Sequence, residues 1–472
     1  MSEKIYNRIW HLSPFVNERK SYDELTSATS ELLSFYEKQG RLDRDPFESS
    51  RNRKIDLPIG TVGAELDNAT CVVTGGLGCV GSVLVQELLK FNVRQIIIID
   101  KVKSEAVPWL ESRVTYCHCD VGNFSLLEKI FSLYKPELVF HTAAQRDPGL
   151  AESQVCETVE TNVMGTMNVV MACEKSGTVK KCIFSSTGKA SRYFTEEIYA
   201  ATKKICECIF ASWSAKSKIK YSIVRFTHII DNSLMCQELE LSSKNNMYVT
   251  IHSPGKYVTA QNAKEAARLM LNALLYAEQG VCNFLIVRNL EWPVESLEVA
   301  LYFIKTSGKS VPLIFSGNPT GYNEKFFRGQ LNWERPDDLN LLINVYECNR
   351  HFLINASGDT IISRILPCEQ DALDHLLASL KDAEGEMETK TCLIEGLRKI
   401  VRGILKNVPK KQTADILTWG LERSVLEASK TTINDFGIMI PLMVESLGNS
   451  EYYKMVEHLF CKELPEDIVV SE

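Results

Sequence analysis

Short apolar runs and longer amphipathic segments alternate along the middle of the chain. The apolar runs have the length of buried strands and lie at residues 71–73, 95–99, 114–117, 138–140, 182–184 and 221–226. Helical patterns separate them, the first at residues 80–89. This alternation predicts an α/β fold, with a doubly wound parallel sheet covered by helices on both faces.

The segments on either side of this region follow other patterns. A Ser21-x-x-Glu24 capping box opens a helix near the N-terminus, and the polar stretch 41–60 predicts a linker or wrapping arm. The pattern is mixed after residue 285 and helical after Pro367. Because 472 residues exceed one ordinary core, several domains are expected. We predict an N-terminal helical arm and linker at 1–64, a Rossmann-type domain at 65–285, a small mixed substrate-side subdomain at 286–366 and a C-terminal helical region at 367–472.

Composition narrows the classes of function. A net charge of −7 and a pI near 5.8 argue against nucleic acid as a main ligand. No apolar run is long enough to span a bilayer, and the N-terminus lacks an apolar signal core, so we expect a cytoplasmic protein. The 15 cysteines form no regular framework. Cys117-His118-Cys119 lies in a strand-like run without a second ligand pair, and we therefore expect no metal site.

A glycine-rich segment joins the first apolar run to the first helix. Glycines permit a tight turn and let a pyrophosphate approach the backbone, while the helix N-terminus supplies N–H groups and a positive dipole end. The strand before it and the helix after it make the motif specific. The segment therefore predicts a dinucleotide site formed by Thr74, Gly75, Gly76, Leu77, Gly78, Cys79, Val80 and Gly81.

Polar and small residues follow the next three apolar runs, at the sheet edge where α/β proteins bind ligands. Asp100 can accept hydrogen bonds from ribose hydroxyls and repels a 2′-phosphate, which favours NAD; Lys101 beside it keeps NADP as the alternative. The remaining cofactor-binding candidates are Asp120 and Val121 at the adenine edge, and His141, Ala143 and Ala144 after the fourth run.

A Tyr-x-x-x-Lys pair follows the fifth run. Tyr199 and Lys203 lie on one helix face, and a nearby ammonium lowers the pKa of a phenol. A tyrosinate can take an alcohol proton while hydride leaves for a nicotinamide. Thr187, at the end of the run, can hydrogen-bond the reacting oxygen, and Lys203 can hold the nicotinamide ribose.

In this order the motifs resemble the extended short-chain dehydrogenase/reductase family, and most closely its polysaccharide-biosynthesis members, notably the UDP-N-acetylglucosamine 4,6-dehydratases. The resemblance covers about residues 65–335 and includes Thr161-Asn162-Val163-Met164-Gly165, Ser222-Ile223-Val224-Arg225, Gly321, Glu324 and Lys325. It implies a catalytic triad of Thr187, Tyr199 and Lys203, a cofactor contact at Asn162, and a lysine at Lys189 that serves elimination and binds substrate. Members commonly form dimers through helices that flank the sheet, and we expect a homo-oligomer, most simply a dimer.

Several positions depart from the pattern of the dehydratases. Gly188 replaces the acid before Lys189, and a glycine cannot donate a proton to a leaving hydroxyl; this argues against 4,6-dehydration and leaves hydride transfer intact. The substrate-side segments also differ, reading Phe226-Thr227-His228-Ile229, Gly255-Lys256-Tyr257 and Pro319-Thr320-Gly321. We keep Thr227 and Lys256 as substrate-binding candidates.

Arg146 follows the fourth run and has two interpretations. It can hold an anionic substrate group as a bidentate donor, or form a surface ion pair with Asp147 or Glu152. Two isolated histidines, His228 and His252, are interpreted as packing or surface groups.

Three functions are consistent with these features. The first is an NAD(P)-dependent oxidoreductase acting on a secondary alcohol or ketone of a sugar or similar polar intermediate. The second is a nucleotide-sugar epimerase or 4,6-dehydratase with internally recycled NAD. The third is a non-catalytic binding module, against which the complete triad argues.

Overall fold

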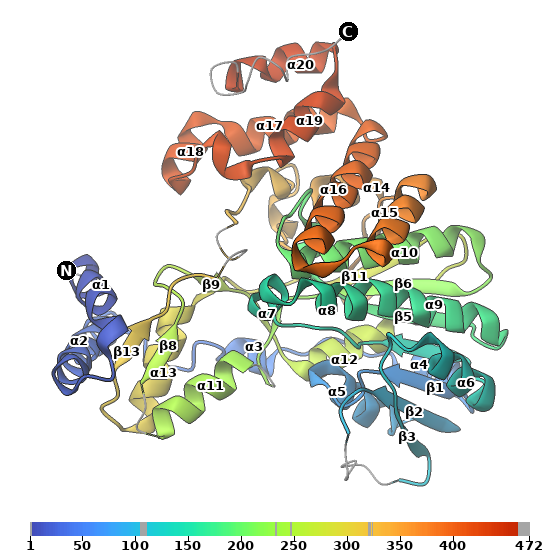
Figure 1. The fold of residues 1–472 in the computed structure, drawn as a ribbon, viewed down its shortest axis with the longest axis horizontal. Helices are drawn as coiled ribbons and strands as arrows, with labels where there is room; N and C mark the ends of the chain where they lie inside the picture. The colour runs from blue at the N-terminus through green and yellow to red at the C-terminus, as the bar shows by residue number, and fades with distance from the viewer. Residues whose placement is uncertain are drawn as a thin grey trace. The chain divides into compact units, whose positions relative to one another are not determined.

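The computed structural model describes residues 2–103, 111–231, 234–245, 248–319, 322 and 324–460 (Figure 1). The described chain divides into two compact units, each assembled from three separated segments. Unit 1 contains Met1–Lys54, Thr227–Ala266 and Leu290–Pro319, and unit 2 contains Ile55–Phe226, Ala267–Asn289 and Thr320–Glu472. The predicted boundaries at 64, 285 and 366 follow the order of the chain, whereas spatial contacts join segments that are far apart in it.

Within the described residues, unit 2 is built on a nine-stranded sheet of order β14-β15-β11-β6-β5-β4-β1-β2-β3. Neighbouring strands pair in parallel along the part of this order that runs from β11 through β6, β5, β4, β1 and β2 to β3, which confirms the Rossmann-type doubly wound fold. At the other edge, β15 is antiparallel to β11, and β14 is antiparallel to β15. The strands are β1 (Thr70–Thr74), β2 (Gln95–Asp100), β3 (Val114–His118), β4 (Leu138–His141), β5 (Lys181–Thr187), β6 (Lys220–Phe226), β11 (Asn283–Val287), β14 (Leu353–Ile354) and β15 (Thr360–Arg364).

Helices connect and cover these strands. They are α4 (Ile59–Leu66), α5 (Cys79–Leu88), α6 (Phe124–Tyr134), α7 (Pro148–Ser153), α8 (Val155–Val159), the π-helical turn η2 (Glu160–Met164), α9 (Gly165–Ser176), α10 (Ile198–Lys216) and α14 (Val345–Arg350). Short 3₁₀ turns include η3 (Gly188–Ser191), η4 (Arg328–Gln330) and η5 (Pro336–Asp338). The predicted linker at 41–60 is wrong at its end, because α4 begins at Ile59 and buries Val62 and Leu66.

The C-terminal part of unit 2 is helical throughout its described residues, as predicted. Its helices are α15 (Gln370–Asp382), α16 (Gly385–Lys406), α17 (Lys410–Leu421), α18 (Arg423–Ser429), α19 (Met439–Leu447) and α20 (Glu451–Val456), with 3₁₀ turns η6 (Ile433–Phe436) and η7 (Glu457–Leu459). The apolar stripe of α16 is buried, and this helix packs on α8, α10 and α15 (Figure 1). None of the helices in the described ranges combines the length and apolar character that a bilayer span requires.

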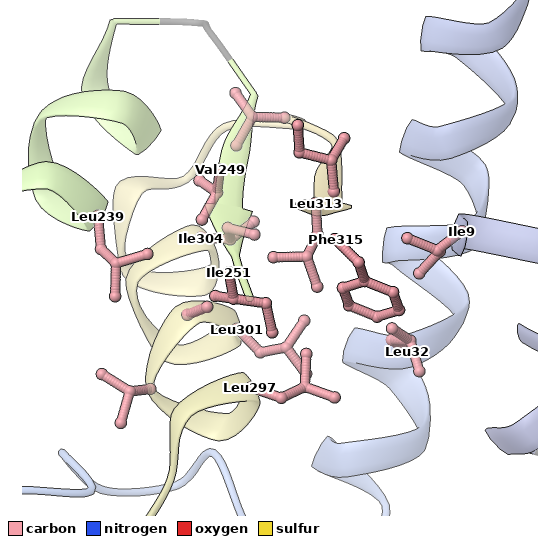
Figure 2. Packing of buried hydrophobic residues seen from close by; sticks show 14 of the residues in the cluster. Ile9, Leu32, Leu239, Val249, Ile251, Leu297, Leu301, Ile304, Leu313 and Phe315 are labelled. Carbon is pink, nitrogen blue, oxygen red and sulfur yellow. The ribbon is translucent and has the colours of Figure 1, made fainter. Parts of the chain in front are cut away.

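Unit 1 has its own apolar core. Its helices are α1 (Ser2–Leu12), α2 (Arg19–Glu37), α3 (Glu48–Asn52), α11 (Leu234–Lys244) and α13 (Ser296–Ser307), with the 3₁₀ turn η1 (Ser13–Phe15); α12 (Ala263–Asn272) carries the chain into unit 2. Its strand pairs are β8 (Val249–Ile251) with β13 (Leu313–Phe315), β7 (His228–Ile229) with β10 (Ala260–Gln261), and β9 (Tyr257–Val258) with β12 (Val294–Glu295). Ile9 and Leu32 pack against Leu301 and Phe315 (Figure 2). The N-terminal helices are therefore part of a core rather than a free arm.

Candidate functional site

The glycine-rich turn after β1 is shaped by close approaches between backbone atoms. Gly75 has a φ of +68°, and its N–H donates to the Ile99 carbonyl over 2.7 Å. A Cβ at Gly75 would lie 2.6 Å from the nitrogen of Ala143, and one at Gly81 would lie 2.2 Å from the Gly75 oxygen. These distances exclude side chains. The turn therefore brings bare backbone and the N-terminus of α5 to the carboxyl edge of the sheet, an arrangement that fits a pyrophosphate.

Asp100 braces this turn. Its carboxylate is buried and accepts hydrogen bonds from the backbone N–H of Leu77 over 3.0 Å and of Val102 over 3.1 Å. A carboxylate has further lone pairs, so ribose hydroxyls remain compatible with this arrangement. Lys101 forms an ion pair with Glu157 over 3.1 Å. This pair partly neutralises the positive charge that could otherwise favour the 2′-phosphate of NADP.

The residues after β3 have mainly local contacts. The Asp120 carboxylate accepts the Gly122 N–H over 2.8 Å. Val121 is buried, and its side chain lies where a Cβ on Gly165 would approach within 2.6 Å. The predicted adenine contacts at these two positions stay predictions.

His141 lies in a buried polar environment, and its predicted cofactor contact stays a prediction. Its imidazole is fully buried, with Nδ1 2.7 Å from the Thr74 hydroxyl and Nε2 2.9 Å from the Thr166 hydroxyl. Burial and the nearby Lys203 charge lower its pKa to about 3, so the ring is neutral. Because both ring nitrogens are engaged in the core, the imidazole supports Thr74. The backbone that follows, at Ala143, is the part that faces the glycine turn.

Asn162 links three segments around the site. It lies in the π-helical turn η2, and such turns often occur at functional positions. Its amide accepts the Gln145 N–H over 2.8 Å, and it donates to the Gln145 carbonyl and to the Thr202 hydroxyl, each over 3.1 Å. Asn162 thereby holds the segment after β4 against α10, the helix that carries Tyr199 and Lys203.

The predicted triad comes together at the end of β5 and the start of α10. The phenol of Tyr199 is in hydrogen-bond contact with Thr187. The Lys203 ammonium donates to the Ser185 carbonyl over 2.9 Å and lies 4.6 Å from the centre of the Phe184 ring. All three residues are buried or nearly so, which suits a proton transfer shielded from water.

The protonation of this triad differs from the expectation. Burial raises the pKa of Tyr199, with a further increase from the Glu197 charge, while the Thr187 hydrogen bond and the Arg146 charge oppose it. Burial also lowers the pKa of Lys203 to about 8. The net shift of the phenol pKa is therefore upward, opposite to the lowering expected from a neighbouring ammonium, and burial is its largest cause.

A cluster of paired charges lies beside Tyr199. Lys189 forms an ion pair with the buried carboxylate of Glu197, which also accepts from Arg192 over 3.1 Å. Arg192 and Thr195 both donate to Glu324 over 2.7 Å. The ring of Tyr322 lies 5.1 Å from the Lys189 ammonium. We call these residues the Lys189 cluster: Lys189, Arg192, Thr195, Glu197, Tyr322 and Glu324.

The Lys189 cluster was only partly visible in the sequence. The sequence predicts a catalytic and substrate-binding role for Lys189, whereas Glu324 enters only as part of the family resemblance. Burial lowers the pKa of Lys189, and the Glu197 carboxylate opposes this shift. Burial likewise raises the pKa of Glu324, against the Arg192 charge. The two glutamates thus keep two partly buried cations beside the phenol.

Gly188 is confined by a side chain from a distant segment. A Cβ at this position would lie 2.1 Å from Cδ2 of Leu342. An aspartate could occupy the position only if Leu342 moved. A larger residue at position 188 would therefore require the Leu342 side chain to shift.

The remaining candidates have separate environments. The Arg146 charge lowers the pKa of Tyr199. Of the two acids proposed as its surface partners, Asp147 accepts backbone N–H groups of α7, and Glu152 pairs with Lys390. Both interpretations of Arg146 stay predictions. Thr227 and Lys256 belong to unit 1, where the Thr227 N–H donates to Gln261 over 2.8 Å. Their substrate roles stay predictions, and Thr320 and Gly321 lie outside the described residues.

No group of three or more His, Cys, Asp and Glu side chains in the described ranges is arranged to hold a metal ion. His118, from the Cys-His-Cys run, places its Nε2 3.0 Å from the Lys101 carbonyl oxygen.

The sequence of this chain is similar to those of proteins from several bacteria. The chain is 26% identical over 352 residues to the capsular polysaccharide biosynthesis protein CapD of Staphylococcus aureus, covering 71% of this chain and 55% of that protein. It is 28% identical over 166 residues to an inverting UDP-N-acetylglucosamine 4,6-dehydratase of Campylobacter jejuni, covering 34% of this chain and 48% of that protein. The chain spans about half the length of these curated relatives.

Structural comparison agrees with the topology. The crystal structure of Pen from Bacillus thuringiensis matches with a TM-score of 0.54 at 20% identity, covering 63% of this chain and 89% of that chain. This likeness concerns the fold. The family model described as polysaccharide biosynthesis protein matches residues 71–318, from the first strand of the sheet to the end of the β13 segment. The chain belongs to this polysaccharide biosynthesis protein family, within the extended short-chain dehydrogenases/reductases.

Proposed function

We propose that this protein is an NAD-dependent oxidoreductase that transfers hydride at a hydroxyl-bearing carbon of a nucleotide-sugar or a similar polar biosynthetic intermediate. The observation that carries the proposal is the contact between Thr187 and Tyr199, with Lys203 one helical turn further along α10. These three groups lie in the same unit as a glycine turn that accepts no side chains. Family membership is consistent with this chemistry.

The chain's own residues divide the work of such a reaction. Thr187 orients the substrate oxygen, and Tyr199 takes its proton on oxidation or returns one on reduction. Lys203 holds the nicotinamide ribose, and Asn162 keeps the segment after β4 in place against α10. NAD, when bound, supplies the hydride acceptor. Because burial raises the pKa of Tyr199, its deprotonation depends on the Thr187 hydrogen bond and the Arg146 charge, which both lower it.

NAD rather than NADP is proposed because of Asp100. Its buried carboxylate lies at the end of β2, beside the turn, where a 2′-phosphate would meet a negative charge. Lys101 is the cation that could offset this charge, but it pairs with Glu157. Titration with both cofactors tests the preference directly.

A nucleotide-sugar epimerase or 4,6-dehydratase with recycled NAD is the second candidate. The relative named for UDP-N-acetylglucosamine 4,6-dehydration favours it. Dehydration through an acid at position 188 is disfavoured, because Gly188 has no side chain that could donate a proton to a leaving hydroxyl. A purely non-catalytic binding module would have no chemical need for the buried Tyr199 and Lys203.

The first experiment is native mass spectrometry of the purified protein, followed by titration with NAD and NADP. Tightly retained NAD, and a changed sugar without net redox after incubation with UDP-glucose or UDP-N-acetylglucosamine, would select the recycled-cofactor candidate. Reversible binding with net nicotinamide reduction by a nucleotide-sugar is the result expected of the main proposal. Failure to bind either cofactor would refute both.

We further propose a cytoplasmic location and a homo-oligomer. The free thiols of the described cysteines are consistent with a reducing compartment. A dimer would need a face other than the one formed by α8 and α10, because α15 or α16 packs on these helices. Size-exclusion chromatography with light scattering measures the oligomeric state.

A further inference from the structure

A carboxylate from a neighbouring helix caps the start of α10. Glu152, in the last turn of α7, accepts the backbone N–H of Ile198 over 2.8 Å, and its side chain is 7% exposed. Ile198 is the first residue of α10, and Tyr199 is the second. The capped backbone N–H therefore belongs to the residue immediately before Tyr199.

The cap is needed because α10 lacks one of its own. The first N–H groups of a helix have no partner within it, and an anion near them is favourable. Glu197, which precedes α10, makes no side-chain capping bond, and its carboxylate is engaged by Lys189 and Arg192. Glu152 supplies the acceptor and the negative charge that Glu197 does not.

Glu152 is in turn held by the C-terminal helical region. Its second carboxylate oxygen pairs with Lys390 of α16 over 3.2 Å. The same face of α16 contacts α8, where the Glu386 carboxylate accepts the Cys156 N–H over 3.0 Å and the Thr389 hydroxyl lies 3.3 Å from the Cys156 sulfur. Residue 390 lies outside the matched family segment, 71–318. A region beyond the family segment thus contacts the residue that caps the tyrosine helix.

We propose that Glu152 is a positioning residue for Tyr199, and that Lys390 of the C-terminal helical region holds Glu152 in place. This proposal rests on the proposed function of Tyr199 as the proton-transfer group. Loss of either side chain loosens the first turn of α10 and displaces the phenol from Thr187. The cofactor turn after β1 is made by other segments and keeps its geometry.

The test compares four variants of the full chain: Glu152→Ala, Glu152→Gln, Lys390→Met and, as the matched control, Glu386→Ala. The control breaks a contact between the same helical region and α8 but leaves Ile198 capped. Three properties are measured: amide hydrogen exchange in the first turn of α10, the NAD Kd, and the single-turnover rate of nicotinamide reduction or sugar conversion with UDP-glucose or UDP-N-acetylglucosamine.

Glu152→Ala is expected to speed exchange at the start of α10 and to slow turnover about tenfold, since small displacements of a reacting group are costly, while the NAD Kd stays within about twofold. Glu152→Gln retains an acceptor for the Ile198 N–H and recovers most of the rate. Lys390→Met slows turnover by about threefold, a fraction of the loss in Glu152→Ala, because the acceptor remains but is less firmly held. Glu386→Ala matches the wild type.

Equal exchange and turnover in Glu152→Ala and the wild type would overturn the proposal. An equal loss in Glu152→Gln and Glu152→Ala would overturn the capping role. If the wild type converts no nucleotide-sugar, the proposed function fails, while hydrogen exchange still decides whether Glu152 and Lys390 hold the first turn of α10.

Discussion

The glycine turn after β1 and the Lys189 cluster lie in the same unit but are specified by different physics. In the turn, backbone atoms approach so closely that a single Cβ at Gly81 would lie 2.2 Å from a carbonyl oxygen. In the cluster, two cations and two carboxylates balance one another through side-chain contacts, with Arg192 shared between Glu197 and Glu324. The turn therefore tolerates no added atoms, whereas the cluster tolerates changes of shape but responds to changes of charge.

The largest effect is expected from adding one methyl group to the turn. Gly81→Ala forces backbone atoms apart, and overpacking of this kind costs roughly 1–3 kcal/mol, which corresponds to a rise in the NAD Kd of roughly 5–150-fold if the strain falls on the binding geometry. Isothermal titration calorimetry with NAD measures this change.

Gly60→Ala is the matched control for that prediction. Gly60 lies in α4, and a Cβ there would meet nothing within 4 Å. Alanine favours a helix interior over glycine, so this variant should bind NAD normally and gain up to about 1 kcal/mol in free energy of unfolding. Equal NAD binding by Gly81→Ala and Gly60→Ala would show that backbone crowding does not shape the turn.

An intermediate effect is expected from removing one charge from the cluster. Glu197→Gln leaves Lys189 and Arg192 with less counter-charge and costs about 1.5–3 kcal/mol in free energy of unfolding, the range for hydrogen bonds to charged groups. The Glu197 charge raises the pKa of Tyr199, so its removal lowers that pKa, and the rise of the oxidation rate with pH moves to lower pH.

Glu324→Gln serves as the control for this shift, because it removes the charge paired with Arg192 while Glu197 keeps its charge. The pH–rate profile of Glu324→Gln should stay closer to that of the wild type. A shift toward higher pH in Glu197→Gln would contradict the electrostatic account of the cluster.

The smallest effect is expected in the pH dependence of the free energy of unfolding that Lys203 contributes. Burial lowers the pKa of Lys203 to about 8 in the folded chain, below the ordinary value of a lysine. Between these two values the unfolded chain binds more protons than the folded one, so the contribution of Lys203 to stability rises with pH above 8, by at most about 1.4 kcal/mol per pH unit. Denaturant unfolding of the wild type and Lys203→Met across this window measures the difference, and a flat or falling difference would contradict the buried ammonium.

The sequence was informative where function depends on neighbouring residues. The turn from Thr74 to Gly81 and the Tyr199–Lys203 pair are local motifs, and the expected elements place them correctly at the sheet edge. Their chemistry follows from residue type and from the strand or helix on either side.

The parts that the sequence did not reveal depend on contacts between distant segments. Leu342 blocks the space beside Gly188, and Glu324 joins Arg192, although neither has a recognisable motif. The buried role of His141 and the raised pKa of Tyr199 follow from desolvation, which depends on the completed packing. For the same reason the polar pattern of the N-terminal helices suggests an arm and does not reveal that they belong to the core of unit 1.

The central claim is that Tyr199 carries the proton in a nicotinamide-dependent reaction, and Tyr199→Phe tests it most directly. The substitution removes one oxygen and keeps the ring that packs in the site. We predict that the variant binds NAD as the wild type does, while single-turnover conversion of the nucleotide-sugar accepted by the wild type slows by roughly 10²–10⁴-fold, the usual contribution of a general acid or base. Conversion at the wild-type rate would contradict the account.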